Sequence, residues 1–341
     1  MTQEIMSLAK AYEKYFDIGA AISPPSLTIH KDLLTKHFNS LTCENQMKYE
    51  PMHPAENKWV FEPADQIVAF AKENGMRMRM HAPVWHNQTP KWFFEANGRL
   101  APRELVFERL EQHIKVLTER YGDAVYSWDV VNEATNDKLD EMFLRRFGNN
   151  PYRLTDYLVT CGVEYLEKAY HLARKYAPHC QLFYNDYNEC DPLKRERIYN
   201  LMKNLLDRGA PLDGFGMQTH YNINRPDLDE VKKSIEMYAS LGLRIHITEM
   251  DINFYTDVHS NEAAMEITDE MREKQNEIYV KLFELYRSYS DVIDSVTTWG
   301  VADDYSWLSR PNRPNYPLLF NADHSPKPCV YKMIDDAVAG K

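Results

Sequence analysis

Two short segments of the chain place carboxylates where a buried strand should end. Residues 128–133 (WDVVNE) and 247–251 (ITEMD) each begin with an apolar residue and carry a glutamate, Glu133 or Glu249, at or near the end. An unpaired carboxylate inside a protein is costly or shifts its pKa, so buried strands rarely end this way. Glycoside hydrolysis uses two facing carboxyl groups, one as the acid and the other as nucleophile or base. We therefore take Glu133 and Glu249 as a candidate catalytic pair.

Neighbouring side chains could set the charge of Glu249. Strand alternation puts Glu249 and Asp251 on one face, and it turns His246 outward towards a helix layer as a packing residue. His220 ends another expected strand. A histidine beside Glu249 could hydrogen-bond that carboxylate and hold it ionised, and Asp251 could orient the histidine.

Asn132 directly precedes Glu133, so a regular strand would turn the two side chains in opposite directions. Both reach the same rim if the strand ends or bulges between them. Asn132 could then donate to a sugar hydroxyl beside the cleaved bond. The alternative is an asparagine that only forms a turn.

The elements that must position these residues alternate along the chain. Short β-like runs lie near residues 16–23, 38–45, 76–84, 125–133, 181–186, 214–220, 243–251 and 296–300. Amphipathic helical patterns lie between or after them, among them residues 103–121, 158–176, 193–208, 228–241, 266–289 and 329–338. This order predicts an α/β fold, a single (β/α)8 TIM barrel over residues 1–341. A doubly wound sheet is the alternative, but it needs a glycine-rich loop after the first strand, where Gly19 stands alone.

In such a barrel the active site forms at the carboxyl ends of the strands. Most of the expected strands end there on polar or aromatic residues: Glu44 and Asn45, His81, Asn132 and Glu133, Asn185 and Asp186, Gln218 and His220, Glu249 and Asp251, and Trp299. One such end would mean little, but their agreement predicts a functional rim.

Three tryptophans, Trp85, Trp299 and Trp307, fall in these rim segments. Flat indole faces suit the apolar faces of pyranose rings, and the indole N–H can bond a hydroxyl. A single tryptophan would be explained by core packing, whereas three near one rim favour sugar binding. Lys48, three residues after Asn45, could reach a sugar hydroxyl, although a solvated lysine is the ordinary alternative.

Composition excludes several classes of protein. The formal net charge of −11 argues against nucleic-acid binding, which needs basic surfaces. No apolar stretch approaches the length of a membrane span or of a signal peptide. The five cysteines are scattered without CxxC spacing, which indicates free thiols in a reducing compartment. We therefore expect a cytoplasmic enzyme with no membrane or nucleic-acid partner.

A metal-dependent hydrolase is the chemical alternative, since His81, His86 and His220 accompany the carboxylates. Metal-binding barrels usually pair ligands at i, i+2 on one strand or gather them tightly, and here Glu249 and Asp251 alone have that spacing. We expect neither a metal nor a cofactor. A sugar-binding protein without catalysis would lack one glutamate of the pair, and both are present.

Taken together and in this order, the segments resemble glycoside hydrolase family 10, the β-1,4-xylanases. The similarity runs along almost the whole chain. It includes residues 44–48, 81–86 with Gln88, 128–133, 216–220, 247–251, 298–300, 304–307, and 317–320 followed by 327–328. One departure is Ala82 and Pro83, which replace a more usual Thr-Leu-like pair.

The resemblance implies that Glu133 is the acid/base and Glu249 the nucleophile, with net retention of anomeric configuration. His220, Asp251 and Asn132 would support them. The residues that would hold the substrate are Glu44, Asn45, Lys48, His81, Trp85, Gln88, Tyr187, Gln218, Trp299 and Trp307, with Tyr187 on the leaving-group side.

The resemblance also implies a substrate class. The chain is similar to endo-1,4-β-xylanases of the type without a signal peptide, which process short xylo-oligosaccharides. A β-1,4-glucan or cellobiosyl hydrolase on the same barrel is the alternative. The retaining mechanism requires the two carboxyl groups to lie about 5–5.5 Å apart.

Overall fold

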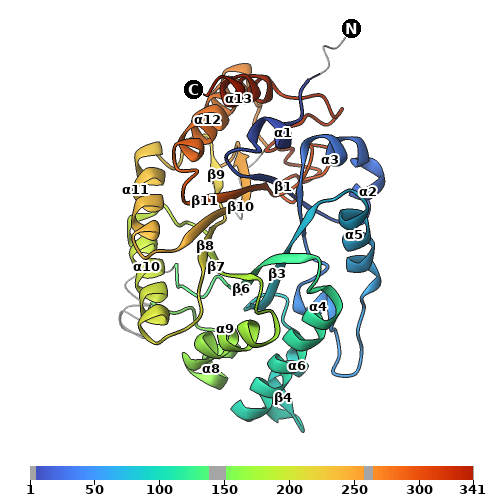
Figure 1. The fold of residues 1–341 in the computed structure, drawn as a ribbon, viewed down its shortest axis with the longest axis vertical. Helices are drawn as coiled ribbons and strands as arrows, with labels where there is room; N and C mark the ends of the chain where they lie inside the picture. Colours follow the sequence, from blue (N-terminus) through green and yellow to red (C-terminus); the bar gives the residue numbers. More distant parts are fainter. Residues whose placement is uncertain (1–4, 138–150, 257–263, 341) are drawn as a thin grey trace.

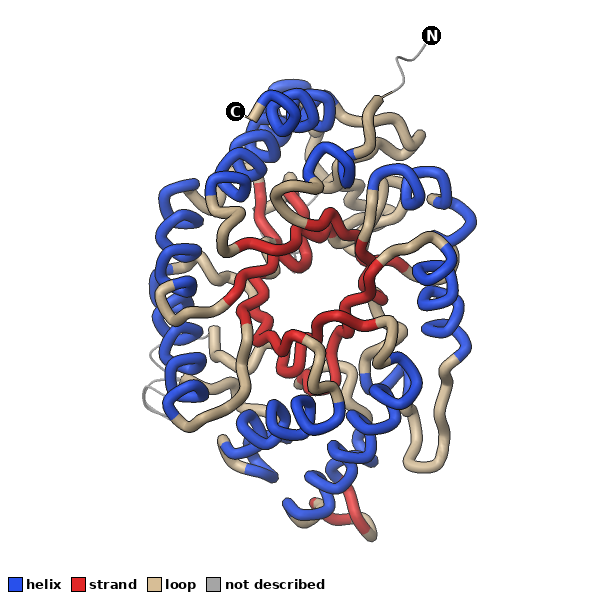
Figure 2. The backbone as a smooth tube through the Cα atoms, viewed as in Figure 1, coloured by secondary structure: helices blue, strands red, loops and turns tan. Residues whose placement is uncertain are grey.

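The computed structural model describes residues 5–137, 151–256 and 264–340. Eight parallel strands form a closed ring, which Figure 2 shows end-on inside a layer of helices. They are β1 (Asp17–Ile22), β2 (Ser40–Cys43), β3 (Arg77–Trp85), β6 (Val125–Asn132), β7 (Gln181–Asp186), β8 (Gly214–Met217), β10 (Arg244–Asn253) and β11 (Ile293–Thr298). Pairing of β11 with both β1 and β10 closes the ring. The predicted (β/α)8 barrel is therefore confirmed.

Helices cover the outside of the ring (Figure 1). The longer ones are α5 (Glu62–Glu73), α6 (Arg103–Tyr121), α9 (Glu164–Tyr176), α10 (Pro192–Asp207), α11 (Leu228–Ala239), α12 (Asp269–Ser288) and α13 (Pro328–Ala339). The shorter ones are α1 (Leu8–Tyr12), α2 (Ser26–Ile29), α3 (Lys31–His37), α4 (Tyr49–Met52), the 3-10 helix η1 (Lys91–Phe94) and α8 (Asp156–Cys161). Two short strands, β4 (Glu95–Ala96) and β5 (Arg99–Leu100), form a small hairpin, and β9 (His220–Asn222) extends the ring beside β10.

Local sequence explains several element ends. The helix expected over residues 158–176 is divided into α8 and α9, because Gly162 takes a φ of 65° that does not continue a helix. Asp191 begins α10 by accepting hydrogen bonds from the backbone N–H groups of Leu193 and Lys194. At the ends of the chain, the Tyr12 hydroxyl donates to the carbonyl of Met333, which joins α1 to α13.

The barrel interior contains a buried cluster of charged and aromatic side chains. Arg79 bonds both oxygens of Asp129 and also contacts His246, whose ring stacks on Phe183 at 4.1 Å between centroids. Gly214 leaves the space for this cluster, because a Cβ there would lie 2.2 Å from the Phe183 ring. The side chains fill the ring as a core rather than leaving a pore.

His246 thus faces the barrel interior, and the prediction that it faces the helices is wrong. The pairing of β10 with β11 shifts register between Ile247 and Met250. The extra residue of this bulge reverses the alternation, so His246 and Glu249 both point inward.

Within the described residues, no helix is both long and apolar enough to cross a lipid bilayer.

Candidate active site

A cleft of about 750 Å³ opens at the carboxyl ends of the barrel strands. Of the predicted site residues, Asp251 lies behind the cleft wall and the rest line the cleft: Glu44, Asn45, Lys48, His81, Trp85, Gln88, Asn132, Glu133, Tyr187, Gln218, His220, Glu249, Trp299 and Trp307. The fold therefore brings together residues that are up to 263 positions apart in sequence (307 − 44).

Glu133 follows directly on the end of β6. Its φ of 57° breaks the strand, which lets both Glu133 and Asn132 reach the cleft. The indole N–H of Trp85 donates to Oε2 of Glu133 at 2.8 Å, and the amide of Gln218 donates to Oε1 at 3.1 Å. Burial raises the pKa of Glu133 above its ordinary value, and the negative charges of Asp186 and Glu249 raise it further against these hydrogen bonds.

Glu249 lies on β10 in a contrasting environment. Its Oε1 accepts a 2.7 Å hydrogen bond from the amide of Asn185, and its Oε2 lies 3.1 Å from Nε2 of His220. Burial alone would raise the pKa of Glu249, but the His220 hydrogen bond and the charges of His81 and His220 bring it below its ordinary value. One carboxyl group therefore favours its proton, whereas the other favours its charge.

The two glutamates are joined by a bridge of amides. The Asn132 side-chain N–H donates to Oε1 of Glu133 at 3.2 Å, and its oxygen accepts from Nδ2 of Asn185 at 2.9 Å. Nδ2 of Asn185 also donates to Glu249. This bridge fixes the two candidate catalytic carboxyl groups relative to each other through two side chains.

Asn185 was not among the predicted site residues. It stood at a strand end on the rim, but nothing in the sequence distinguished it from its neighbours. The available signal is Gly216, inside a strand where glycine is unfavourable. A Cβ on Gly216 would lie 2.2 Å from Oδ1 of Asn185, so this glycine makes room for the bridge.

Lys48 places a buried amino group in the cleft. Its Nζ donates to Oδ1 of Asn45 at 2.9 Å and lies 4.6 Å from the centre of the Trp85 ring and 5.8 Å from that of Trp299. Burial lowers the pKa of Lys48, although the charges of Glu249 and other carboxylates oppose the shift. Gln88 donates to the same Asn45 oxygen at 3.3 Å.

His81 is held in place by Asp129 of the interior cluster. Its Nδ1 lies 3.0 Å from Oδ2 of Asp129, and its ring meets the Trp299 ring edge-on at 5.3 Å between centroids. The Ala82 and Pro83 substitution leaves this arrangement within β3, which continues to Trp85 after a register shift. His81 therefore keeps its place in the cleft wall.

The loop after β11 forms another part of the wall. The Tyr305 hydroxyl donates to Oε2 of Glu44 at 3.1 Å, and the indole N–H of Trp307 donates to Oδ2 of Asp251 at 2.9 Å. Tyr305 is a second residue that the sequence analysis did not single out. Its position beside the expected Trp307 was the only signal for it.

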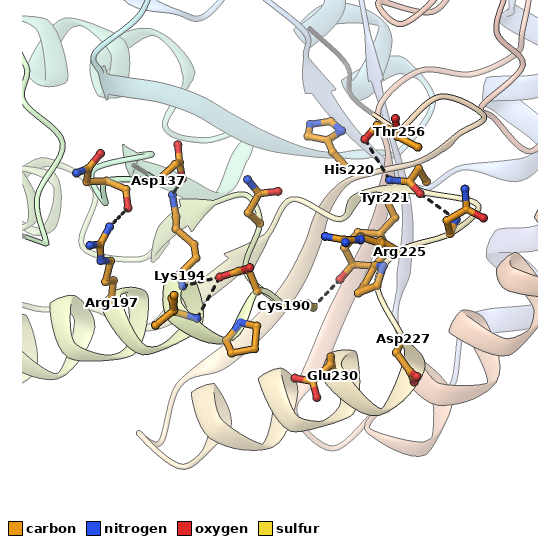
Figure 3. Close-up of a pocket in the computed structure, with 18 residues that line it drawn as sticks. Asp137, Cys190, Lys194, Arg197, His220, Tyr221, Arg225, Asp227, Glu230 and Thr256 are labelled. Carbon is orange, nitrogen blue, oxygen red and sulfur yellow. Dashed lines mark hydrogen bonds and ion pairs between the residues drawn. The ribbon is translucent and has the colours of Figure 1, made fainter. Parts of the chain in front are cut away.

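Tyr187 lies among charged residues and is linked to Glu133 through Arg153. Arg153 donates to the Tyr187 hydroxyl at 3.0 Å and to the backbone carbonyl of Glu133 at 2.8 Å, and both Arg153 and Tyr187 contact Asp137. A second cavity of about 640 Å³ continues from the cleft and shares His220 and other residues with it. Figure 3 shows Asp137 and Lys194 on one side of this cavity and Tyr221 and Thr256 on the other.

The sequence matches Glycosyl hydrolase family 10 over residues 7–336. The chain belongs to this family. The family assignment confirms the resemblance deduced from the motifs and the expectation of a retaining glycoside hydrolase.

Similar proteins share the architecture over almost their full length. Endo-1,4-beta-xylanase B of Paenibacillus barcinonensis is 45% identical over 338 residues, which cover 98% of this chain and 99% of that protein. Endo-1,4-beta-xylanase A of Caldicellulosiruptor saccharolyticus is 46% identical over 335 residues, which cover 96% of this chain and 95% of that protein. The crystal structure of CbXyn10B has a TM-score of 0.91 at 44% identity, covering 97% of this chain and 99% of that one. A mutant structure in complex with xylotriose has a TM-score of 0.92 at 44% identity, covering 97% and 100%.

Proposed function

We propose that this family 10 enzyme is an endo-1,4-β-xylanase that hydrolyses internal β-1,4 bonds of xylan or xylo-oligosaccharides with retention. The observation that carries the mechanism is the opposite pKa shift of two carboxyl groups held by one amide bridge. The substrate class is supported by the names of the similar proteins and by the xylotriose complex among them.

In this mechanism Glu133, whose pKa is raised, donates its proton to the departing glycosidic oxygen. Glu249 is ionised and attacks the anomeric carbon, which forms a covalent glycosyl-enzyme. Glu133, now ionised, takes a proton from the water that hydrolyses this intermediate. A raised and a lowered pKa are what these two roles require.

The remaining residues would bind the sugars of the substrate or keep Glu249 ionised. The glycone sugars would be bound by Glu44, Asn45, Lys48, His81, Gln88 and Gln218 through polar groups, and by Trp85, Trp299 and Trp307 through ring faces. Tyr187 would contact the sugar on the leaving-group side. Asn132 would donate to a hydroxyl beside the cleaved bond, and His220 with Asp251 would keep Glu249 ionised.

The deciding experiment compares hydrolysis of an aryl β-xylobioside with that of an aryl β-cellobioside, with Glu249→Ala as the inactive control. We expect a higher kcat/KM for the xylobioside and loss of turnover in the variant. A preference for the cellobioside would move the substrate to β-1,4-glucans while keeping the two-carboxylate mechanism. Turnover that survives in the variant, or that a chelator abolishes, would contradict the mechanism.

We also propose a cytoplasmic location. The five cysteines are buried thiols without disulfide partners, which is the usual state in a reducing compartment. Fractionation of the source cells tests this, and recovery of the enzyme from the medium would contradict it.

A further inference from the structure

We propose that His30, Asp304 and His324 form a binding site for a zinc ion outside the catalytic cleft. His30 lies between α2 and α3, after the first barrel strand, whereas Asp304 and His324 lie in the long connection from β11 to α13. One ligand atom from each residue converges, with all three atoms within 4.8 Å of one another. None of the three lines the cleft.

The distances fit a metal site. Nε2 of His30 lies 2.9 and 3.1 Å from the two carboxylate oxygens of Asp304, and Nε2 of His324 lies 3.3 Å from one of them. Tetrahedral zinc with bonds of about 2.0–2.1 Å places its ligand atoms about 3.3 Å apart. Small side-chain movements would therefore admit the ion. Two imidazoles and a carboxylate form a donor set typical of zinc, with water in the fourth position.

The ligands are held in place yet remain accessible. The His30 side chain is 2% exposed, whereas those of Asp304 and His324 are 27% and 34% exposed, which leaves an entry path on one side. The His30 backbone is fixed at both ends, because its N–H donates to Ser26 and its carbonyl accepts from Leu34. The two imidazole rings lie 5.0 Å apart, edge to face. A site built on a buried histidine needs little rearrangement to bind.

The competing explanation is a hydrogen-bonded network in which each histidine donates Nε2–H to the shared carboxylate. In that network each Nε2 donates its hydrogen to Asp304, whereas a zinc ligand needs a free lone pair on Nε2 and carries its hydrogen on Nδ1. The network alone predicts no saturable zinc binding, so a direct zinc titration distinguishes the two explanations.

Occupancy would affect the wall of the cleft. Asp304 precedes Tyr305, which bonds Glu44, and the same loop carries Trp307, which bonds Asp251. A metal ion would tie this loop to the segment after the first strand. We expect zinc to raise stability and to lower KM modestly, with kcat unchanged because the ion touches no reacting group.

The test is calorimetric titration of ZnCl2 into the chelator-treated full-length protein, together with melting temperatures with and without zinc. We expect one site per chain and a rise in melting temperature. His324→Ala and Asp304→Asn should each weaken binding at least tenfold and remove the rise. Both side chains are partly exposed, so both variants should fold.

His179→Ala is the matched control, because His179 is exposed and lies outside the cluster. It should bind zinc as the unchanged protein does. Absence of saturable binding, or binding that is equal in His324→Ala and His179→Ala, would overturn the proposal in favour of the hydrogen-bonded network.

Discussion

Nε2 of His220 lies 3.1 Å from Oε2 of Glu249, on the side of the carboxylate away from the amide bridge. The other ring nitrogen of His220 lies 2.9 Å from Oδ2 of Asp251. Burial opposes charge on this ring, but the two carboxylates prevail, and together they raise the pKa of His220 to about 10. His220 is therefore an imidazolium at neutral pH, donating to both partners. Glu249 keeps its charge because this cation is kept in place by Asp251.

The first prediction concerns Asp251. In Asp251→Asn the pKa of His220 should fall, so that Glu249 loses part of its cationic neighbour and its own pKa rises. In the proposed mechanism Glu249 must be ionised to attack, so the acid limb of the kcat/KM profile should move upward by roughly one pH unit, or about 1.4 kcal/mol. The measurement is kcat/KM against pH on an aryl β-xylobioside.

Asp294→Asn is the control for this experiment. Asp294 pairs with Arg244 at the start of the barrel strands, so its loss should leave the pH profile unchanged. An acid limb that moves equally in both variants, or in neither, would refute the role given to Asp251.

The second prediction concerns the electrostatic coupling between Glu133 and Glu249, the proposed catalytic pair. The charge of Glu249 is one of the causes that raise the pKa of Glu133, after burial and the charge of Asp186. Glu249→Gln should therefore lower the pKa of Glu133 without returning it to the ordinary value. A ¹³C NMR titration of labelled glutamate carboxyl groups measures it directly. Glu44→Gln removes a cleft carboxylate that is not one of the groups raising the pKa of Glu133, so it should leave the titration curve of Glu133 unchanged.

Sequence reasoning succeeded where a rule depends on the chain order alone. The carboxyl ends of parallel strands meet at one rim, so polar strand ends were enough to predict that Glu44, Gln218 and Glu249 share a cleft. The rule needed no knowledge of how any strand is paired.

It failed where the outcome depends on pairing between distant strands. The alternation that turned His246 outward assumes a regular register, but the bulge between Ile247 and Met250 arises from the pairing with β11. Asn185 was missed for a similar reason, because its role depends on space that Gly216 leaves on the neighbouring strand. Such facts require the closed barrel.

The third prediction tests that space. In Gly216→Ala the new Cβ would lie 2.2 Å from Oδ1 of Asn185 and 2.9 Å from Thr248, so Asn185 must move. The amide bridge to Glu249 would loosen, and kcat should fall by roughly 10- to 100-fold, since small displacements of positioning groups are costly.

Asn185→Ala provides the reference for a double-mutant cycle. If Gly216→Ala acts by displacing Asn185, then adding it to Asn185→Ala should cost little further activity. Fully additive losses in kcat would show that the methyl group acts on something else.

The fourth prediction concerns stability. Arg79 and Asp129 are both buried in the barrel interior, where Asp129 also holds His81. Removing one partner of a buried ion pair leaves the other charge uncompensated, so Asp129→Asn should lower the free energy of unfolding by about 3–5 kcal/mol. Asp207→Asn, which breaks an exposed pair with Lys203, should have little measurable effect. Urea unfolding at pH 7 compares the two variants.

The same pair sets a pH dependence. Burial would raise the pKa of Asp129, but the charge of Arg79 and the hydrogen bonds of His81 and Arg79 bring it below the ordinary value. A carboxyl group with a lowered pKa in the folded state stabilises the protein above its unfolded pKa of about 3.9, and this contribution is lost as the pH falls through the folded value. The difference in stability between the unchanged protein and Asp129→Asn should therefore be the same at pH 7 and pH 5.5 and shrink only in stronger acid. A difference that already disappears at pH 5.5 would mean that Asp129 is protonated in the folded protein and that Arg79 is compensated in another way.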